Sequence, residues 1–287
     1  MRRSATRGWL GVAGGFLALC GVGCFEKQPS TNPAVGVADD PYALAETRFS
    51  DAYFLKPTRK LEGSEAFVLA PLIVQYAGGD DDALEKRLFG RAPFDNAALR
   101  ASSTSATLYF AISSVEIHGR SHRQVTYRWW YPRSPGREAT VGQGLRMTLD
   151  DAGQPALWEI LVQAEGLRFI VASSPLEEAA AAEFGGPLVD RRYALERPLE
   201  EYPDVFVVRS IAPGPVPMGP FVYLGDPVPT PVTVICRCMP SQFDALRGSG
   251  YYELVPMTQL GDDAARGLPD ELKAIPLEKC LRLPAKF

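Results

Sequence analysis

The sequence of 287 residues is poor in histidine, with only two, and it contains no dense cluster of lysine and arginine. Its net charge is −4. Nucleic acids and anionic membrane surfaces attract clustered cations, so we expect no nucleic-acid partner. The scarcity of histidine also means that any histidine base or metal ligand must be His118 or His122.

The common catalytic signatures are missing as well. The sequence has no Gly-x-Ser-x-Gly elbow, no His-Glu-x-x-His helix and no Gly-x-x-x-x-Gly-Lys phosphate loop. The sequence therefore lacks the motifs by which α/β hydrolases, zinc proteases and P-loop nucleotide-binding proteins are usually recognised. Glycosidase chemistry based on two carboxylates leaves no local motif to search for. We therefore favour a non-enzymatic protein.

The apolar run nearest the N-terminus is too short to span a bilayer. The run from Trp9 to Gly23 carries no charge and reaches about 22 Å as a helix, against roughly 30 Å for a bilayer core. Three arginines, Arg2, Arg3 and Arg7, precede it, and residues 1 to 8 contain no acid. This pattern is typical of a secretory signal peptide.

The end of this run, Gly21-Val22-Gly23-Cys24, resembles the signal of bacterial lipoproteins. In that family a small-residue sequence ends in a cysteine that receives diacylglycerol and becomes the new N-terminus. Leu usually stands where this chain has Gly21. The frame ending at Cys20 has such a Leu, but it puts the bulky Leu19 at the cleavage position. The alternative is an ordinary cleaved signal peptide with two incidental cysteines.

The resemblance implies an exported protein of the bacterial cell envelope, anchored in the membrane by a lipid on Cys24. In enterobacterial lipoproteins an Asp after the lipidated cysteine retains the protein at the inner membrane. Phe25 stands at that position here, which favours the outer membrane.

The remaining sequence has the composition of a folded protein. Hydrophobic residues make up 46 % and charged residues 22 %, which is enough to bury a core. We expect a signal peptide over 1–23, a flexible tether rich in Pro, Ser and Asn over 24–45, and a single globular domain over 46–287. The alternative division treats 241–287 as a C-terminal extension.

The middle of the chain predicts two β-hairpins. One joins 104–117 to 123–131 through a loop at 118–122, and the other joins 144–149 to 156–162. Further strands are expected at 167–172, 205–210, 221–224 and 232–238. Helices are expected at 82–90 and from Ser174, where Ser174-Pro175-Leu176-Glu177 forms a capping box, to the stop at Gly185. The sequence therefore predicts an α+β fold: a mostly antiparallel β sheet built from consecutive hairpins, with a few short helices.

Cysteine is the residue type with the most specific functional implication. If Cys20 leaves with the signal peptide and Cys24 is lipidated, three cysteines remain: Cys236, Cys238 and Cys280. On a strand, Cys236 and Cys238 would lie about 6.6–7 Å apart at Cα, near the upper limit for a disulfide. We expect one bridge, from Cys280 to Cys236 or Cys238, and one spare thiol.

The alternative is a small metal- or thiol-dependent site centred on Cys236 and Cys238. Thiolates suit copper(I), and His118 and His122 could complete a zinc-like set. Zinc sites usually have two to four residues between paired cysteines, and here there is one. We expect no cofactor, with copper or zinc as the alternative.

An aromatic row is the last candidate. Tyr127, Trp129 and Tyr131 fall on one face of a predicted strand. Exposed, they would form a platform for a glycan or a protein partner; buried, they would fill the sheet core. Together these features predict a lipid-anchored binding or envelope-structural module.

Overall fold

The computed structural model describes residues 52–76, 89–91, 94–95, 98–99, 105–131, 141–162, 167–224, 231–236, 249–260 and 276–287. The predicted signal peptide, the tether, Cys24 and residues 82–88 of the helix expected at 82–90 lie outside them, and the described Gly90 forms a β-bridge with Trp130 instead of ending a helix. Within this part the protein is an α+β fold made mostly of strands. The strands are β1 (Ala52–Pro57), β2 (Leu72–Tyr76), β3 (Phe94–Asp95), β4 (Ala98–Leu99), β5 (Thr107–Ile117), β6 (Arg120–Tyr131), β7 (Val141–Leu149), β8 (Pro155–Leu161), β9 (Arg168–Ser173), β10 (Val205–Ile211), β11 (Pro220–Leu224), β12 (Pro231–Cys236) and β13 (Ser249–Pro256).

The helices of the described part are few and short, as the sequence predicts. They are the 3-10 turns η1 (Arg59–Leu61) and η3 (Met257–Leu260), and the α-helices α2 (Glu65–Val68), α4 (Ser174–Phe184) and α6 (Leu277–Cys280). Among the described residues, no helix combines the length and apolar character that crossing a membrane requires.

Eleven strands form one sheet, in the order β10-β9-β8-β7-β6-β5-β13-β1-β2-β11-β12, and β3 pairs with β4 separately. The sheet is mixed rather than mostly antiparallel. Neighbours β5 to β9 form a run of consecutive antiparallel hairpins, but four pairs are parallel: β9 with β10, β5 with β13, β13 with β1, and β2 with β11. Local turn signals find hairpins, whereas a parallel pair joins segments far apart in sequence and leaves no local signal.

The predicted hairpins are confirmed, with one change at the first turn. The loop contains only His118 and Gly119, both with positive φ (51° and 71°), and β6 begins at Arg120 rather than Arg123. A two-residue loop with both φ values positive is the tight turn that matches the twist of the paired strands.

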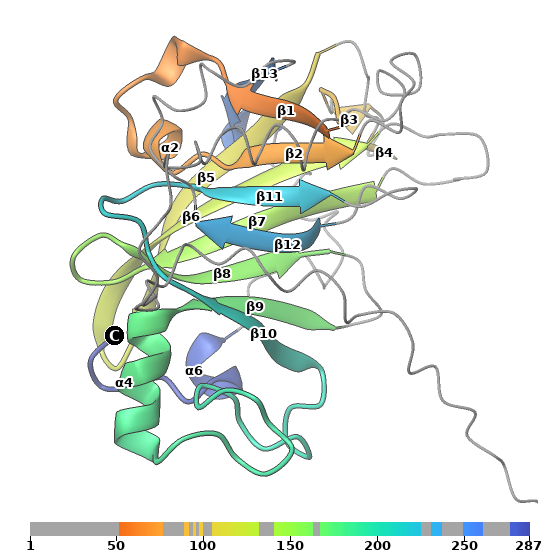
Figure 1. The fold of residues 1–287 in the computed structure, drawn as a ribbon. Coiled ribbons are helices and arrows are strands. Elements are labelled where there is room, and N and C mark those ends of the chain that lie inside the picture. The colour runs from red at the N-terminus through yellow and green to blue at the C-terminus, as the bar shows by residue number, and fades with distance from the viewer. Residues whose placement is uncertain are drawn as a thin grey trace, which may run out of the picture.

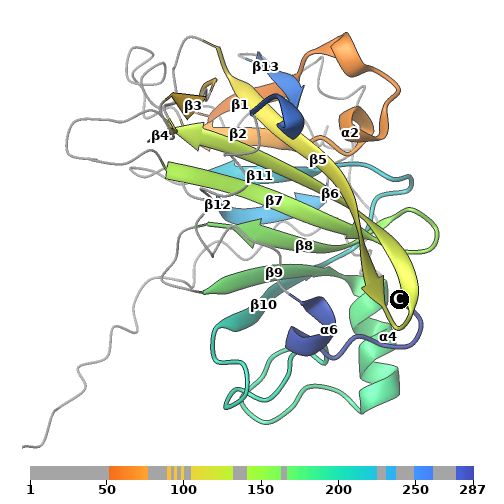
Figure 2. The same cartoon turned by 180° about the vertical axis from the view of Figure 1, so that it is seen from behind.

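The sheet curls so that β1, β2, β11 and β12 lie across β6, β7 and β8 (Figures 1 and 2). We call β1, β2, β11 and β12 one arm of the sheet and β5 to β10 the other. The main core fills the space between these two arms. Leu55, Ile73, Val222 and Val234 come from one arm, and they belong to the same buried cluster as the inward residues of β6 to β8. The curl therefore gives the sheet an inner face, packed on itself, and an outer face.

A second layer covers part of the outer face. Helices α4 and α6 and the C-terminal segment pack on β8, β9 and β10 (Figure 2), in a buried cluster that includes Leu157, Ile170, Leu176 and Leu281. The cap of helix α4 is Ser173, whose side chain accepts the Leu176 N–H, so the capping box predicted from Ser174 to Glu177 is wrong and the helix begins at Ser174. The helix ends as predicted at Gly185, in the left-handed region.

The described residues near the C-terminus lie in the sheet and in its second layer. Strand β13 lies inside the sheet between β1 and β5, and α6 lies in the second layer. The division of the chain into a single domain over 46–287, or a domain with an extension over 241–287, stays a prediction.

Candidate functional site

The aromatic row of β6 lies in the main core. Tyr127 and Trp129 are fully buried and Tyr131 is 3 % exposed. The Tyr127 hydroxyl donates to the Ala66 carbonyl at 2.8 Å, and the Trp129 indole N–H donates to Gln143 Oε1 at 3.2 Å. The hypothesis of an exposed ligand platform is therefore wrong, because the curled sheet places a second arm over these rings.

The two histidines contact the C-terminal segment. His118, in the turn between β5 and β6, lies with Nε2 3.0 Å from the Leu283 carbonyl and Nδ1 3.6 Å from Glu278. His122 is buried, with Nδ1 3.2 Å from the Leu149 carbonyl and its ring 4.6 Å from that of Phe287. Both rings thus help to hold residues 276–287 on the hairpin.

Cys280 is a buried free thiol, so the expected bridge to Cys236 or Cys238 is not formed in this structure. Burial raises the pKa of the Cys280 thiol, and the nearby Glu159 carboxylate raises it further. A raised pKa keeps the thiol protonated and weakly nucleophilic. The backbone of Cys236 ends β12, while its side chain and all of Cys238 lie outside the described residues.

No group of three or more His, Cys, Asp and Glu side chains within the described ranges could hold a metal ion. The predicted set of Cys236, Cys238, His118 and His122 cannot be assembled from this part of the chain alone. Copper or zinc binding at the two cysteines stays a prediction.

A strip of polar side chains on the outer face of β6, β7 and β8 was not singled out by sequence reasoning. Strand pairing places Thr126 beside Arg146 and Arg146 beside Glu159. It also places Gln124 beside Thr148, in a second row of the same face. All members of this outer strip are less than 8 % exposed: Gln124, Thr126, Arg128, Arg146, Thr148 and Glu159. Buried charge of this kind is rare and needs compensation.

Within the outer strip, Arg146 and Glu159 form a buried two-point ion pair. Arg146 Nε donates to Glu159 Oε2 at 2.5 Å, and Nη2 donates to Oε1. Such fork-shaped pairing fixes both side chains. Beside it, Gln124 Nε2 donates to Thr148 Oγ1 at 2.9 Å. The strip's only carboxylate is therefore committed to an arginine.

Arg128 is the second guanidinium of the outer strip. Burial, together with the neighbouring charge of Arg146, lowers the pKa of Arg128 to about 10, which leaves it protonated at neutral pH. Its side chain passes closely over Gly144, where a Cβ would come within 3.1 Å of Arg128 Cγ and 2.3 Å of the Tyr127 carbonyl. The strip thus offers hydrogen-bond donors held in place, rather than a free base for proton transfer.

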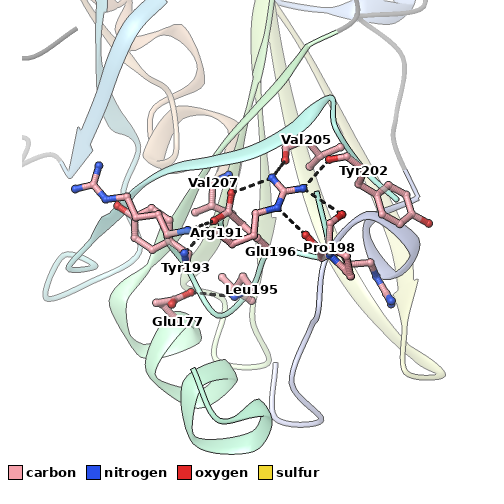
Figure 3. A network of polar contacts seen from close by, with 11 residues as sticks. Glu177, Arg191, Tyr193, Leu195, Glu196, Pro198, Tyr202, Val205 and Val207 are labelled. Atoms are coloured by element: carbon pink, nitrogen blue, oxygen red, sulfur yellow. Dashed lines mark hydrogen bonds and ion pairs between the residues drawn. The ribbon is translucent and has the colours of Figure 1, made fainter. Parts of the chain in front are cut away.

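A second buried charge network organises the loop between α4 and β10, residues 185–204 (Figure 3). The Arg191 guanidinium donates to the carbonyls of Arg197, Pro198, Tyr202 and Val205 at 2.7–3.4 Å and lies 3.5 Å from Glu196. Glu196 in turn accepts three backbone N–H groups, from Arg192, Tyr193 and Val207.

Glu177 of α4 supports the same loop from the other side. Its carboxylate accepts the N–H groups of Ala194 at 2.6 Å and Leu195 at 3.3 Å. Burial raises the pKa of Glu177, although the two N–H donors act in the opposite direction. These charges satisfy backbone groups in a loop that lacks regular structure.

The outer strip has a weak signal in the sequence. Alternation along β6 places Gln124, Thr126 and Arg128 opposite the aromatic row, a pattern that ordinarily indicates a solvent-facing side. Nothing local shows that this side is buried. Comparison with known proteins adds no assignment, because no family model, curated protein or solved structure matches the chain.

Proposed function

We propose that this chain is an exported bacterial envelope protein, anchored by a lipid on Cys24, whose folded body is a non-enzymatic binding or structural module. The observation that carries the proposal is the N-terminal sequence: three arginines, an uncharged run from Trp9, and the small-residue sequence ending at Cys24. Phe25 after that cysteine favours the outer membrane.

The described side chains support the non-enzymatic part of the proposal. Glu159 is paired with Arg146, while Glu177 and Glu196 each accept backbone N–H groups. Arg191 is committed to backbone carbonyls. Groups engaged in this way hold loops and strands in position, whereas a general acid or base needs contact with a substrate. A protein or a glycan is the proposed class of partner, and the net charge of −4 argues against nucleic acid.

Metabolic labelling with a clickable fatty acid tests the anchor. The full chain, expressed in a bacterial host, should incorporate the label, and Cys24→Ser should abolish it because the acceptor thiol is gone. Cys20→Ser is the matched control and should label like the wild type, since it lies four residues upstream in the same segment. A wild type without label, or a Cys24→Ser variant that labels fully, contradicts the proposal.

A further inference from the structure

Strand β10 lies at one end of the sheet and, among the described strands, pairs with β9 alone. An edge strand presents unpaired N–H and C=O groups that another chain can use to extend the sheet. The Asp204 carbonyl accepts the Arg168 N–H of β9, so alternation turns the backbone groups of Val205 and Val207 toward the open side.

The Arg191–Glu196 pair occupies this open side (Figure 3). Arg191 Nη1 donates to the Val205 carbonyl at 3.0 Å, and the Val207 N–H donates to Glu196 Oε1 at 3.2 Å. One donor and one acceptor thus take the positions at which an added strand would form its hydrogen bonds. The two side chains are only 2 % and 5 % exposed, so water does not compete at this point.

The charged pair at this position is explained by the backbone groups that it satisfies rather than by a gain in stability. Desolvation offsets most of the attraction within a buried ion pair, and apolar replacements of similar size are often as stable. A charged pair can, however, satisfy a backbone N–H and a carbonyl together, which apolar side chains cannot do.

We infer that Arg191 and Glu196 form an edge clamp that prevents β10 from pairing with a strand of a second copy of this chain. The composition of β10 makes such protection necessary, because Val205, Phe206, Val207 and Val208 form an uncharged run of β-prone residues. Val208 is 40 % exposed, so part of this apolar strand already reaches the surface.

The test is a double variant, Arg191→Leu with Glu196→Leu, in the full chain purified in a mild detergent. Removing both charges avoids leaving one of them buried alone. Sedimentation velocity over a concentration series should show self-association tighter than that of the wild type by roughly tenfold or more, because the open backbone groups gain partners only in the associated form.

The matched control is Arg146→Leu with Glu159→Leu. That ion pair is buried to a similar degree, at 5 % and 4 %, but its strands β7 and β8 are paired on both sides. Replacing this pair removes a buried ion pair without opening an edge, so the control should remain at the wild-type association state. Equal association of both double variants would overturn the inference.

A third substitution separates edge pairing from partial unfolding. Adding Val208→Lys to the clamp variant places a charge on the exposed part of β10, which disfavours strand addition, and should return the protein to the wild-type association state. If association is unchanged by Val208→Lys, or if the clamp variant does not associate, the inference is wrong.

A measurement on the wild type covers the case in which the clamp variant does not fold. Hydrogen exchange of the Val207 amide in the full chain should be as slow as that of the β9 amides, because Glu196 holds it. Exchange at the rate of an exposed amide would overturn the clamp directly.

Discussion

Replacing Trp129 by Ala should lower the free energy of unfolding by about 3–5 kcal/mol, the range for deletion of a buried large aromatic. Trp129 is fully buried between the two arms of the sheet, with its ring centroid 6.2 Å from that of Phe89. This range includes the loss of the indole N–H that donates to Gln143 Oε1, a hydrogen bond worth about 0.5–1.5 kcal/mol. The loss is a large part of the roughly 5–15 kcal/mol that holds a typical protein folded.

The assay is urea unfolding followed by far-ultraviolet circular dichroism, together with a thermal melt. For a protein of this size, a loss of about 3–5 kcal/mol lowers Tm by roughly 6–20 °C. Trp129→Phe keeps most of the apolar volume and should cost clearly less. Tyr251→Ala is the exposed control: Tyr251 is 57 % exposed, with Lys56 Nζ 5.0 Å from its ring centroid, so the change should stay within about 1 kcal/mol.

A Trp129→Ala protein with an unchanged Tm and urea midpoint would refute this reasoning. If that variant also lost binding to a glycan or a protein, the hypothesis of an exposed aromatic platform would return. Equal losses for Trp129→Ala and Tyr251→Ala would likewise show that burial does not explain the cost.

Two further predictions follow from the charges and thiol of the second layer. Cys280 should react with a thiol reagent slowly in the native protein and rapidly in urea, because burial raises the pKa of its thiol. The Cys280→Ser variant shows how much of the labelling comes from Cys280, and fast labelling of Cys280 in the native protein would contradict the prediction. Glu177 has a folded-state pKa above its ordinary value, so its contribution to stability is full below that ordinary value and is lost as the pH rises through the folded pKa. Urea midpoints measured from about pH 4 to 7 should therefore fall more for the wild type than for Glu177→Gln, and the opposite order would show that the pKa is lowered instead.

The hairpins could be predicted because their signals are local. Alternation in β5 to β8 and the turn at His118 and Gly119 each depend on residues within a few positions of one another. The parallel pairs could not, because β13 is placed by contacts with β1 and β5, both far from it along the chain.

The burial of the outer strip could not be predicted either, because it too depends on residues far apart in the sequence. Arg128 stands on the polar side of β6, which the sequence presents as a solvent-facing side, whereas Glu159 shares its face of β8 with Leu157 and Leu161. Their burial depends on the packing of the whole chain, including the second layer of α4 and α6 on the outer face. Likewise, the partners of Arg191 are mostly backbone carbonyls, and a carbonyl has no residue-specific signature.

The position of β13 also determines when the protein can fold. In the described sheet, β13 is the only strand between the arm of β5 to β10 and the arm of β1, β2, β11 and β12. Ser249 of β13 pairs with Phe54 of β1, although the two residues are nearly two hundred positions apart in the chain. A chain still emerging from the ribosome has both arms but not the strand between them until residues 249–256 are made. High contact order of this kind slows folding, because the entropy of closing long loops is lost before the parallel pairs can form.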